Sequence, residues 1–135
     1  MTRRRLIDTN LIVRHLVQDH ERHAQAAAKL FAACDRGDLT LVVLPAVVAE
    51  CVFVLESFYK QPRSNIANTL KSLFSSPGIE LNHLPDHLDA LTRYSRTQFH
   101  FVDCTIAATA SAQGLQVATF DHDFKKFSDV TVNLD

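Results

Sequence analysis

The sequence predicts a single α/β domain, an α/β/α sandwich in which helices cover both faces of a parallel central sheet. Three observations support this fold class. The chain has 135 residues, enough for one well-packed core but too few for two. Its 47% hydrophobic and 21% charged residues are typical of a folded domain. Short apolar segments alternate with segments of helical spacing that are long enough to cross over between parallel strands. We therefore expect one domain over residues 1–135.

The predicted strands are short apolar runs bounded by polar or turn-forming residues. Pro45 separates the second run from the helix that follows, because proline ends a central strand but suits the first turn of a helix. A Ser-Pro-Gly turn at 76–78 precedes the third run. In chain order, the predicted strands cover residues 4–8, 39–44, 79–82 and 116–121, with 130–134 as a candidate last strand.

The predicted helices fill the intervals between these strands. Residues 20–37 carry alanine, lysine and leucine at helical spacing and end at Gly37, a residue type that commonly stops a helix. The other predicted helices cover residues 11–18, 46–59, 63–76, 86–97, 102–114 and the short segment 122–127.

Composition and charge argue against several classes of protein. Residues 1–8 contain three arginines but no apolar stretch of signal-peptide length, and no apolar run approaches the ~20 residues that span a bilayer. We therefore expect a cytoplasmic protein with no membrane span. The net charge of −1 does not by itself indicate nucleic-acid binding. Three cysteines set among apolar residues favour reduced buried thiols over a disulfide or zinc framework: Cys34, Cys51 and Cys104.

Four acidic residues from distant parts of the chain are predicted to meet at one edge of the sheet. Asp8 and Asp121 each end a predicted strand, and parallel strands place their carboxyl ends at the same edge. Glu50 lies one turn into the helix after the second strand and is the only charge between Ala46 and Leu55. Burying such a lone carboxylate costs several kcal/mol unless it is paired. Asp103 opens the alanine-rich helix that precedes the last predicted elements.

Each of these acids also has a purely structural interpretation. The three aspartates could be helix N-caps, because aspartate readily accepts hydrogen bonds from the free N–H groups of a helix start. Glu50 could be a solvated helix residue. Joint occurrence favours a shared site, because independent caps have no reason to lie at one sheet edge and capping does not explain Glu50.

Clustered carboxylates need a cation to remain ionised together. No lysine or arginine adjoins the four acids in the sequence. Oxygen ligands select hard cations such as Mg²⁺ or Mn²⁺, and two such ions about 4 Å apart can activate a water and stabilise the leaving oxygen of a phosphodiester. The predicted chemistry is therefore metal-dependent phosphodiester hydrolysis.

The segments that carry these acids resemble the motifs of PIN-domain nucleases, most closely the VapC-type toxins of bacterial toxin–antitoxin pairs. The resemblance rests on LIDTN (6–10), on Glu50 in its apolar helix, on FVDCTIAATA (101–110) and on VATFDHDF (117–124), and it covers nearly the whole chain. It implies a Rossmann-like α/β/α fold, Mg²⁺- or Mn²⁺-dependent cleavage of single-stranded RNA, homodimerisation and neutralisation by a cognate antitoxin protein.

The resemblance also assigns roles to individual residues. Four acids match the catalytic metal ligands of the family and a fifth lies beside them: Asp8, Glu50, Asp103, Asp121 and, as the fifth, Asp123. Asn10 and Thr119 match positions that hold these acids or the water by hydrogen bonds. Without the five acids, 10 acidic residues stand against 14 lysines and arginines, an excess of +4 that suits phosphate contacts. The candidate contacts are Arg14, Lys60, Arg63, Arg93, Arg96, Lys125 and Lys126.

Three alternative functions are weighed against this hypothesis. Histidine zinc ligation is conceivable at His20–His23 or His83–His87, but no cysteine or acid completes a tetrahedral set for the first pair and Pro85 interrupts the second. An aspartyl-nucleophile phosphatase of the haloacid dehalogenase type needs a second aspartate two residues after the first, where this chain has Asn10. A non-catalytic RNA-binding or interaction module on a PIN scaffold would be expected to have lost one or more of the acids.

Overall fold

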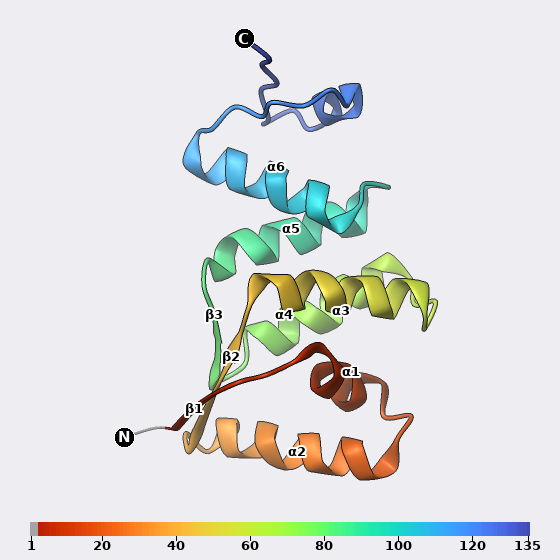
Figure 1. Cartoon of the computed structure of the whole chain (residues 1–135), viewed down its shortest axis with the longest axis vertical. Coiled ribbons are helices and arrows are strands. Elements are labelled where there is room, and N and C mark those ends of the chain that lie inside the picture. The colour runs from red at the N-terminus through yellow and green to blue at the C-terminus, as the bar shows by residue number, and fades with distance from the viewer. Residues whose placement is uncertain (1–2) are drawn as a thin grey trace. The chain divides into compact units, whose positions relative to one another are not determined.

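The computed structural model describes residues 3–135, which form two compact units. Unit 1 ends at Leu84, and unit 2 covers Pro85–Asp135 (Figure 1). Among the described residues, Cys34, Cys51 and Cys104 are buried and form no disulfide bond, as predicted. Among residues 3–135, no helix combines the length and the apolar character needed to cross a bilayer.

Unit 1 is built on a parallel three-stranded sheet with the strand order β1-β2-β3. The strands are β1 (Arg3–Leu6), β2 (Leu39–Val43) and β3 (Ile79–Leu81), and both strand pairs are parallel. Helices α1 (Thr9–Val17) and α2 (Glu21–Asp35) connect β1 to β2, and α3 (Pro45–Ser57) and α4 (Arg63–Phe74) connect β2 to β3. The predicted α/β class and parallel sheet are confirmed.

The core of unit 1 forms around the central strand. Leu39, Leu41 and Val43 of β2 are buried, and the residues between them are only partly exposed. Helix α4 contributes the fully buried Ile66 and Leu70. Each such side chain stabilises the fold by about 1.5–3 kcal/mol relative to an exposed one. The sheet is thereby held in register, and the start of each helix is fixed where its strand ends.

Gly78 allows α2 to pack closely against the turn before β3. Its φ is +77°, and a Cβ built there would lie 2.6 Å from the Cβ of Cys34 and 2.8 Å from the carbonyl oxygen of Leu39. Gly37 has a similar φ of +81°, but a Cβ built there would meet nothing within 4 Å. The two glycines therefore share one backbone conformation and differ in the space around them.

We expect Gly78→Ala to lower the free energy of unfolding by about 2 kcal/mol more than Gly37→Ala. Both substitutions incur the left-handed backbone cost of about 1 kcal/mol, but only the alanine at 78 must displace backbone atoms of its neighbours. Urea unfolding of both variants measures the difference. Equal losses in the two variants would show that the close approach has no energetic weight.

Unit 2 contains two helices, a short 3-10 helix and extended segments. These elements are α5 (Leu84–Arg96), α6 (Phe101–Gln113) and η1 (His122–Lys126). The predicted strands 116–121 and 130–134 are wrong: they meet only in one isolated parallel bridge between Val117 and Val132. Val117 is buried but Phe120 is 89% exposed, so the alternating pattern of the first segment does not bury a continuous face. Such short pairs form stable ladders only with further strands beside them.

Arg93 links α5 to the chain after η1. Its guanidinium donates hydrogen bonds to the carboxylate of Asp89 at 3.1 Å and to both oxygens of Asp129, and it lies 5.4 Å from the ring centroid of Phe127. The hydrogen bond from Arg93, with a smaller contribution from Ser111, holds the pKa of Asp129 well below its ordinary value of 3.8. Asp129 is therefore more acidic in the folded protein than in the unfolded chain.

Asp129→Asn is expected to lower the free energy of unfolding at neutral pH by about 1 kcal/mol, a modest figure because the carboxylate is 44% exposed. A depressed pKa contributes stability above the unfolded value of 3.8, and this contribution is lost as the pH falls toward the folded value. The difference between wild type and variant should therefore shrink in acid. Denaturant melts at neutral pH and below pH 3.8 test this, and a constant difference would contradict it.

Candidate active site

Asp8 lies two residues after the end of β1 and is the N-cap residue of α1. Its carboxylate Oδ1 accepts a hydrogen bond from the backbone N–H of Leu11 at 3.0 Å, so the N-cap interpretation is confirmed for this residue. Asp8 is exposed. Because an ionised carboxylate has two oxygens with two lone pairs each, this cap leaves acceptor capacity for a cation. Capping and metal ligation are therefore compatible at Asp8.

Glu50 is an exposed residue of α3. It is therefore not the buried carboxylate in need of a partner that its apolar sequence neighbours indicated. The helix begins at Pro45 and buries Val48, Cys51 and Leu55. That spacing defines one apolar stripe, and Glu50 lies off it. Apolar neighbours in sequence therefore did not mean apolar neighbours in space, and the carboxylate is solvated.

Two buried residues follow these acids in the sequence. Thr9 is 7% exposed and follows Asp8, and Cys51 is 0% exposed and follows Glu50. Burial raises the pKa of the Cys51 thiol to about 12, helped by the charge of Glu50 and then by that of Asp8. The charges of Glu50 and Asp8 therefore both raise the pKa of the same thiol.

A shallow groove of about 240 Å³ lies beside Asp8, between α1 and α2. Asn10, Arg14 and His23 line it together with Asp8. Arg14 donates a hydrogen bond to Asp19 at 2.9 Å, so its charge is partly neutralised. Asn10, predicted to support the acids, thus shares a groove with one of them.

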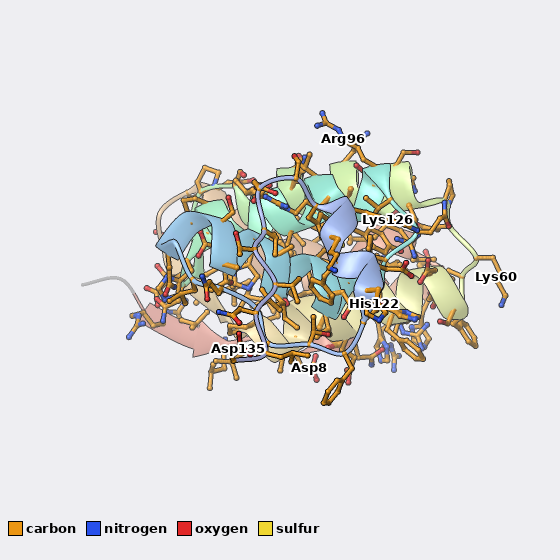
Figure 2. All side chains as sticks on the ribbon, turned by 90° about the horizontal axis from the view of Figure 1, so that it is seen from above. Asp8, Lys60, Arg96, His122, Lys126 and Asp135 are labelled. Atoms are coloured by element: carbon orange, nitrogen blue, oxygen red, sulfur yellow. The ribbon has the colours of Figure 1, made fainter. Side chains whose placement is uncertain are left out.

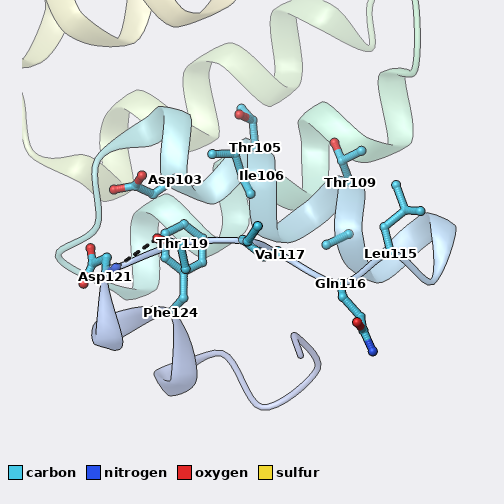
Figure 3. Close-up of a pocket in the computed structure, with 12 residues that line it drawn as sticks. Asp103, Thr105, Ile106, Thr109, Leu115, Gln116, Val117, Thr119, Asp121 and Phe124 are labelled. Carbon is cyan, nitrogen blue, oxygen red and sulfur yellow. Dashed lines mark hydrogen bonds between the residues drawn. The ribbon is translucent and has the colours of Figure 1, made fainter. Parts of the chain in front are cut away.

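In unit 2, Asp103 and Asp121 line a larger groove of about 530 Å³ between α6 and the segment that follows it. Figure 3 shows both carboxylates at the same end of this groove. Asp103 lies in the first turn of α6, but the cap is His100, which makes no side-chain cap bond. The N-cap interpretation is therefore wrong for Asp103.

Asp121 is the N-cap residue of η1 and takes part in two hydrogen bonds, one through its carboxylate and one through its backbone N–H. Its Oδ1 accepts a hydrogen bond from the backbone N–H of Asp123 at 2.9 Å, which confirms the cap interpretation here. Its own backbone N–H donates to the Thr119 hydroxyl oxygen at 3.0 Å (Figure 3). Asp123 itself lies 3.4 Å from the ammonium of Lys126 and lines a different groove from Asp103 and Asp121.

The donor chemistry of Asp103 and Asp121, which line the same groove, fits a hard divalent cation. Among residues 3–135, no three histidine, cysteine, aspartate or glutamate side chains are arranged to hold a metal ion. Mg²⁺ commonly binds through one or two carboxylates and keeps several waters, so this pair of carboxylates matches what the ion requires of a protein. The histidines have structural contacts: His15 stacks on Phe31, and His20 caps α2 and stacks on His23.

The basic side chains predicted to contact phosphate divide into two groups. Some form ion pairs within the chain: Arg14 with Asp19, Arg63 with Glu56, Arg93 with Asp89 and Asp129, and Lys126 with Asp123. Lys60, Arg96 and Lys125 are exposed, and Figure 2 shows Lys60 and Arg96 projecting away from the ribbon. The exposed group is therefore the better source of phosphate contacts.

Comparison with known proteins places the chain among its relatives. The family model described as PIN domain matches residues 5–130. The chain is also similar to a protein of Aquifex aeolicus (strain VF5) named VapC ribonuclease, with 27% identity over 130 residues that cover 96% of each chain. Because the family match runs through both units and includes all five predicted site acids, this chain belongs to the PIN domain family.

Proposed function

We propose that this chain is a metal-dependent endoribonuclease that hydrolyses phosphodiester bonds of single-stranded RNA, and that it serves in the cytoplasm as the toxin of a toxin–antitoxin pair. One observation carries the proposal: Asp8, Glu50, Asp103 and Asp121 are all present within a PIN domain match over residues 5–130. A related protein that is similar over 96% of both chains is named a VapC ribonuclease, which supports the same activity.

In this proposal the four acids hold Mg²⁺ or Mn²⁺, with Asp123 as a fifth acid nearby. The bound ion supplies the activation of a water and the stabilisation of the leaving oxygen. The chain's own hydrogen bonds keep the ligands oriented. The Asp8 carboxylate accepts a hydrogen bond from the N–H of Leu11, and the Asp121 carboxylate accepts one from the N–H of Asp123, so neither has to be ordered when the ion binds. Thr119 holds the backbone of Asp121.

The groove in unit 2 suits an unstacked base. From Asp103 and Asp121 it continues along the side chains of Ile106, Leu115 and Val117. Single-stranded RNA is commonly recognised through splayed bases that rest on apolar or aromatic surfaces while basic residues contact the backbone. The carboxylates at one end of this groove would then face the phosphodiester next to the bound base.

Cleavage of a labelled single-stranded RNA with Mg²⁺, with Mn²⁺ and with EDTA tests the proposal. We expect cleavage with either ion and none in EDTA. RNA that is bound but left intact with both ions would favour the non-catalytic module. Release of phosphate from a phosphomonoester, without cleavage of RNA, would favour the phosphatase.

The proposed toxin role predicts two associations. We expect a homodimer, and a complex with an antitoxin segment whose arginine or lysine pairs with the clustered carboxylates in place of the metal. Light scattering at micromolar concentration tests the first, and co-purification with the product of the adjacent gene tests the second. A monomer would contradict the dimer, and failure to co-purify would contradict the pairing.

A further inference from the structure

We propose that a second groove beside Asp121, the Phe120 groove, binds one of the two nucleotides that flank the scissile phosphate, while the larger groove of unit 2 binds the other. The Phe120 groove is lined by residues 119–122, Lys125 and residues 132–135. In this arrangement Phe120 stacks on the base and Lys125 contacts a backbone phosphate. The inference rests on the proposed function and deepens it, because it describes how the same site holds a second nucleotide of its substrate.

The first step of the argument is the position of this groove. Its volume is about 270 Å³, and all of its lining residues belong to unit 2. Thr119 and Asp121 line both this groove and the larger one, and Figure 3 shows the two residues beside each other at one end of the larger groove. Asp121 therefore lies where the two grooves meet. Because a phosphodiester joins two nucleosides, a phosphate at Asp121 can direct one base into each groove.

The second step is the exposure of Phe120. Its side chain is 89% exposed, and no other large apolar side chain among residues 3–135 is as exposed. Such a ring contributes little to the core, because hydrophobic stabilisation is proportional to the apolar area removed from water. Its open surface can stack on any base, since every base has a π-face. Leu134, which is 60% exposed, adds apolar surface to the same groove.

The third step is the order of the groove before RNA binds. The Thr119 hydroxyl accepts a hydrogen bond from the backbone N–H of Asp121 at 3.0 Å, and this bond spans Phe120 and holds the backbone that carries the ring. In the C-terminal part of the lining, the side-chain amide of Asn133 donates a hydrogen bond to Gln116 at 2.9 Å. Both parts of the lining are thereby held in place, which lowers the ordering cost of binding a nucleotide.

The fourth step is the arrangement of charge on η1. Side chains three residues apart lie on the same side of a 3-10 helix, so His122 and Lys125 share one side, whereas Asp123 and Lys126 share another. The first two residues line the Phe120 groove. The second two line a different groove and form an ion pair at 3.4 Å. Within the part of the chain that the structure describes, the exposed Lys125 forms no ion pair. An unpaired ammonium near an exposed ring matches a nucleotide, which joins a charged phosphate to a flat base.

A basic peptide segment is the competing occupant, because Asp121 and Asp135 also line the groove. With the proposed metal on Asp121, the remaining carboxylate of Asp135 is outweighed by Lys125 and the divalent cation. The groove then attracts a phosphate and repels a basic peptide. Charge therefore favours the RNA strand as the occupant.

The first test measures KM and kcat for RNA cleavage with Mn²⁺. Phe120→Ala should raise the KM about tenfold, through the loss of one base–aromatic stack, and leave kcat within about twofold. Phe120→Tyr keeps a ring and should retain the wild-type KM. Phe58→Ala is the matched control, because Phe58 is 74% exposed and lies in unit 1, outside the groove. All three variants should keep the wild-type melting temperature, since none removes a buried side chain.

The second test measures the salt dependence of the same reaction. Lys125→Gln should flatten the slope of log KM against log salt concentration by about 0.7, the number of counterions released by one phosphate contact with a single strand. Lys125→Arg should keep the wild-type slope. Lys29→Gln, which alters an exposed lysine of α2, should also leave the slope unchanged.

The third test identifies the nucleotide that contacts Phe120, in an RNA whose cleavage position has been mapped. An abasic site on one side of the scissile phosphate should not be additive with Phe120→Ala, whereas an abasic site on the other side should be. In EDTA, where the strand stays intact, 2-aminopurine at the non-additive position should be quenched on saturation with wild type and less quenched with Phe120→Ala.

The outcomes separate this inference from the proposed function. Cleavage by wild type with an unchanged KM and unchanged quenching in Phe120→Ala would overturn the inference and leave the proposed function in place. If Phe120→Ala kept its KM but no longer co-purified with the product of the adjacent gene, the groove would belong to a protein partner and the inference would again be wrong. Wild-type protein that neither binds nor cleaves the RNA would overturn the proposed function, and the role of the groove with it.

Discussion

Asp8→Asn and Asp103→Asn should each slow RNA cleavage by about 10²–10³-fold, a loss typical of removing one group that stabilises the developing charge. Asparagine keeps the shape of aspartate but removes a charge from the metal ligands. At Asp8 it also preserves the cap to Leu11, because asparagine caps a helix about as well as aspartate. At Asp103 there is no cap to lose. The loss of activity should therefore occur in a folded protein.

Initial cleavage rates of a labelled single-stranded RNA, measured with Mg²⁺ and with Mn²⁺, give the size of this effect. Circular dichroism and melting temperature in EDTA establish that both variants are folded. Asp35→Asn is the control, since it removes one negative charge from an exposed position at the end of α2. Undiminished cleavage by either site variant would exclude that aspartate from the metal site.

The second large effect is on stability and depends on metal. Metal that binds only the native state stabilises it by about 2.7 kcal/mol when the ion is at 100 times its Kd. We expect wild type to gain an amount of this order in Mn²⁺ and Asp103→Ala to forgo most of it. In EDTA the order should change, because removal of Asp103 relieves its repulsion of Asp121 across their shared groove.

Asp121→Ala separates capping from metal ligation in the same experiment. It loses the hydrogen bond from the N–H of Asp123, so it should melt below Asp103→Ala in EDTA, by up to about 1 kcal/mol. Both variants should lack the stabilisation by metal. Thermal melts of the three proteins with EDTA and with Mn²⁺ provide the comparison. If Asp103→Ala were destabilised equally in both conditions, with no metal-dependent shift in wild type, the acid would have only a structural role.

The sheet and the helices of unit 1 could be predicted from the sequence because strong local signals mark their ends. Helix α3 begins at Pro45, one residue before its predicted start, and α2 ends two residues before Gly37. Asp8 explains why α1 begins at Thr9 and not at Leu11: the cap lies three residues before the first predicted helical residue, so the helix begins two residues earlier than predicted. Local chemistry at helix ends was sufficient for these boundaries.

Long-range pairing and orientation could not be predicted in the same way. The segments 116–121 and 130–134 contain strand-forming residues, but whether they form a ladder depends on the partners available to them, and only Val117 and Val132 pair. Burial of Glu50 was inferred from its sequence neighbours, whereas the helical period places it off the buried stripe.

Titration of Mn²⁺ into the metal-free protein, followed by calorimetry, tests the central claim most directly. The proposal is that Asp8 and Asp121 are both metal ligands. Wild type should bind Mn²⁺ saturably, and Asp8→Asn and Asp121→Asn should each lose at least about tenfold in affinity while remaining folded. Binding of Mn²⁺ by both variants with wild-type affinity would contradict the proposed metal site.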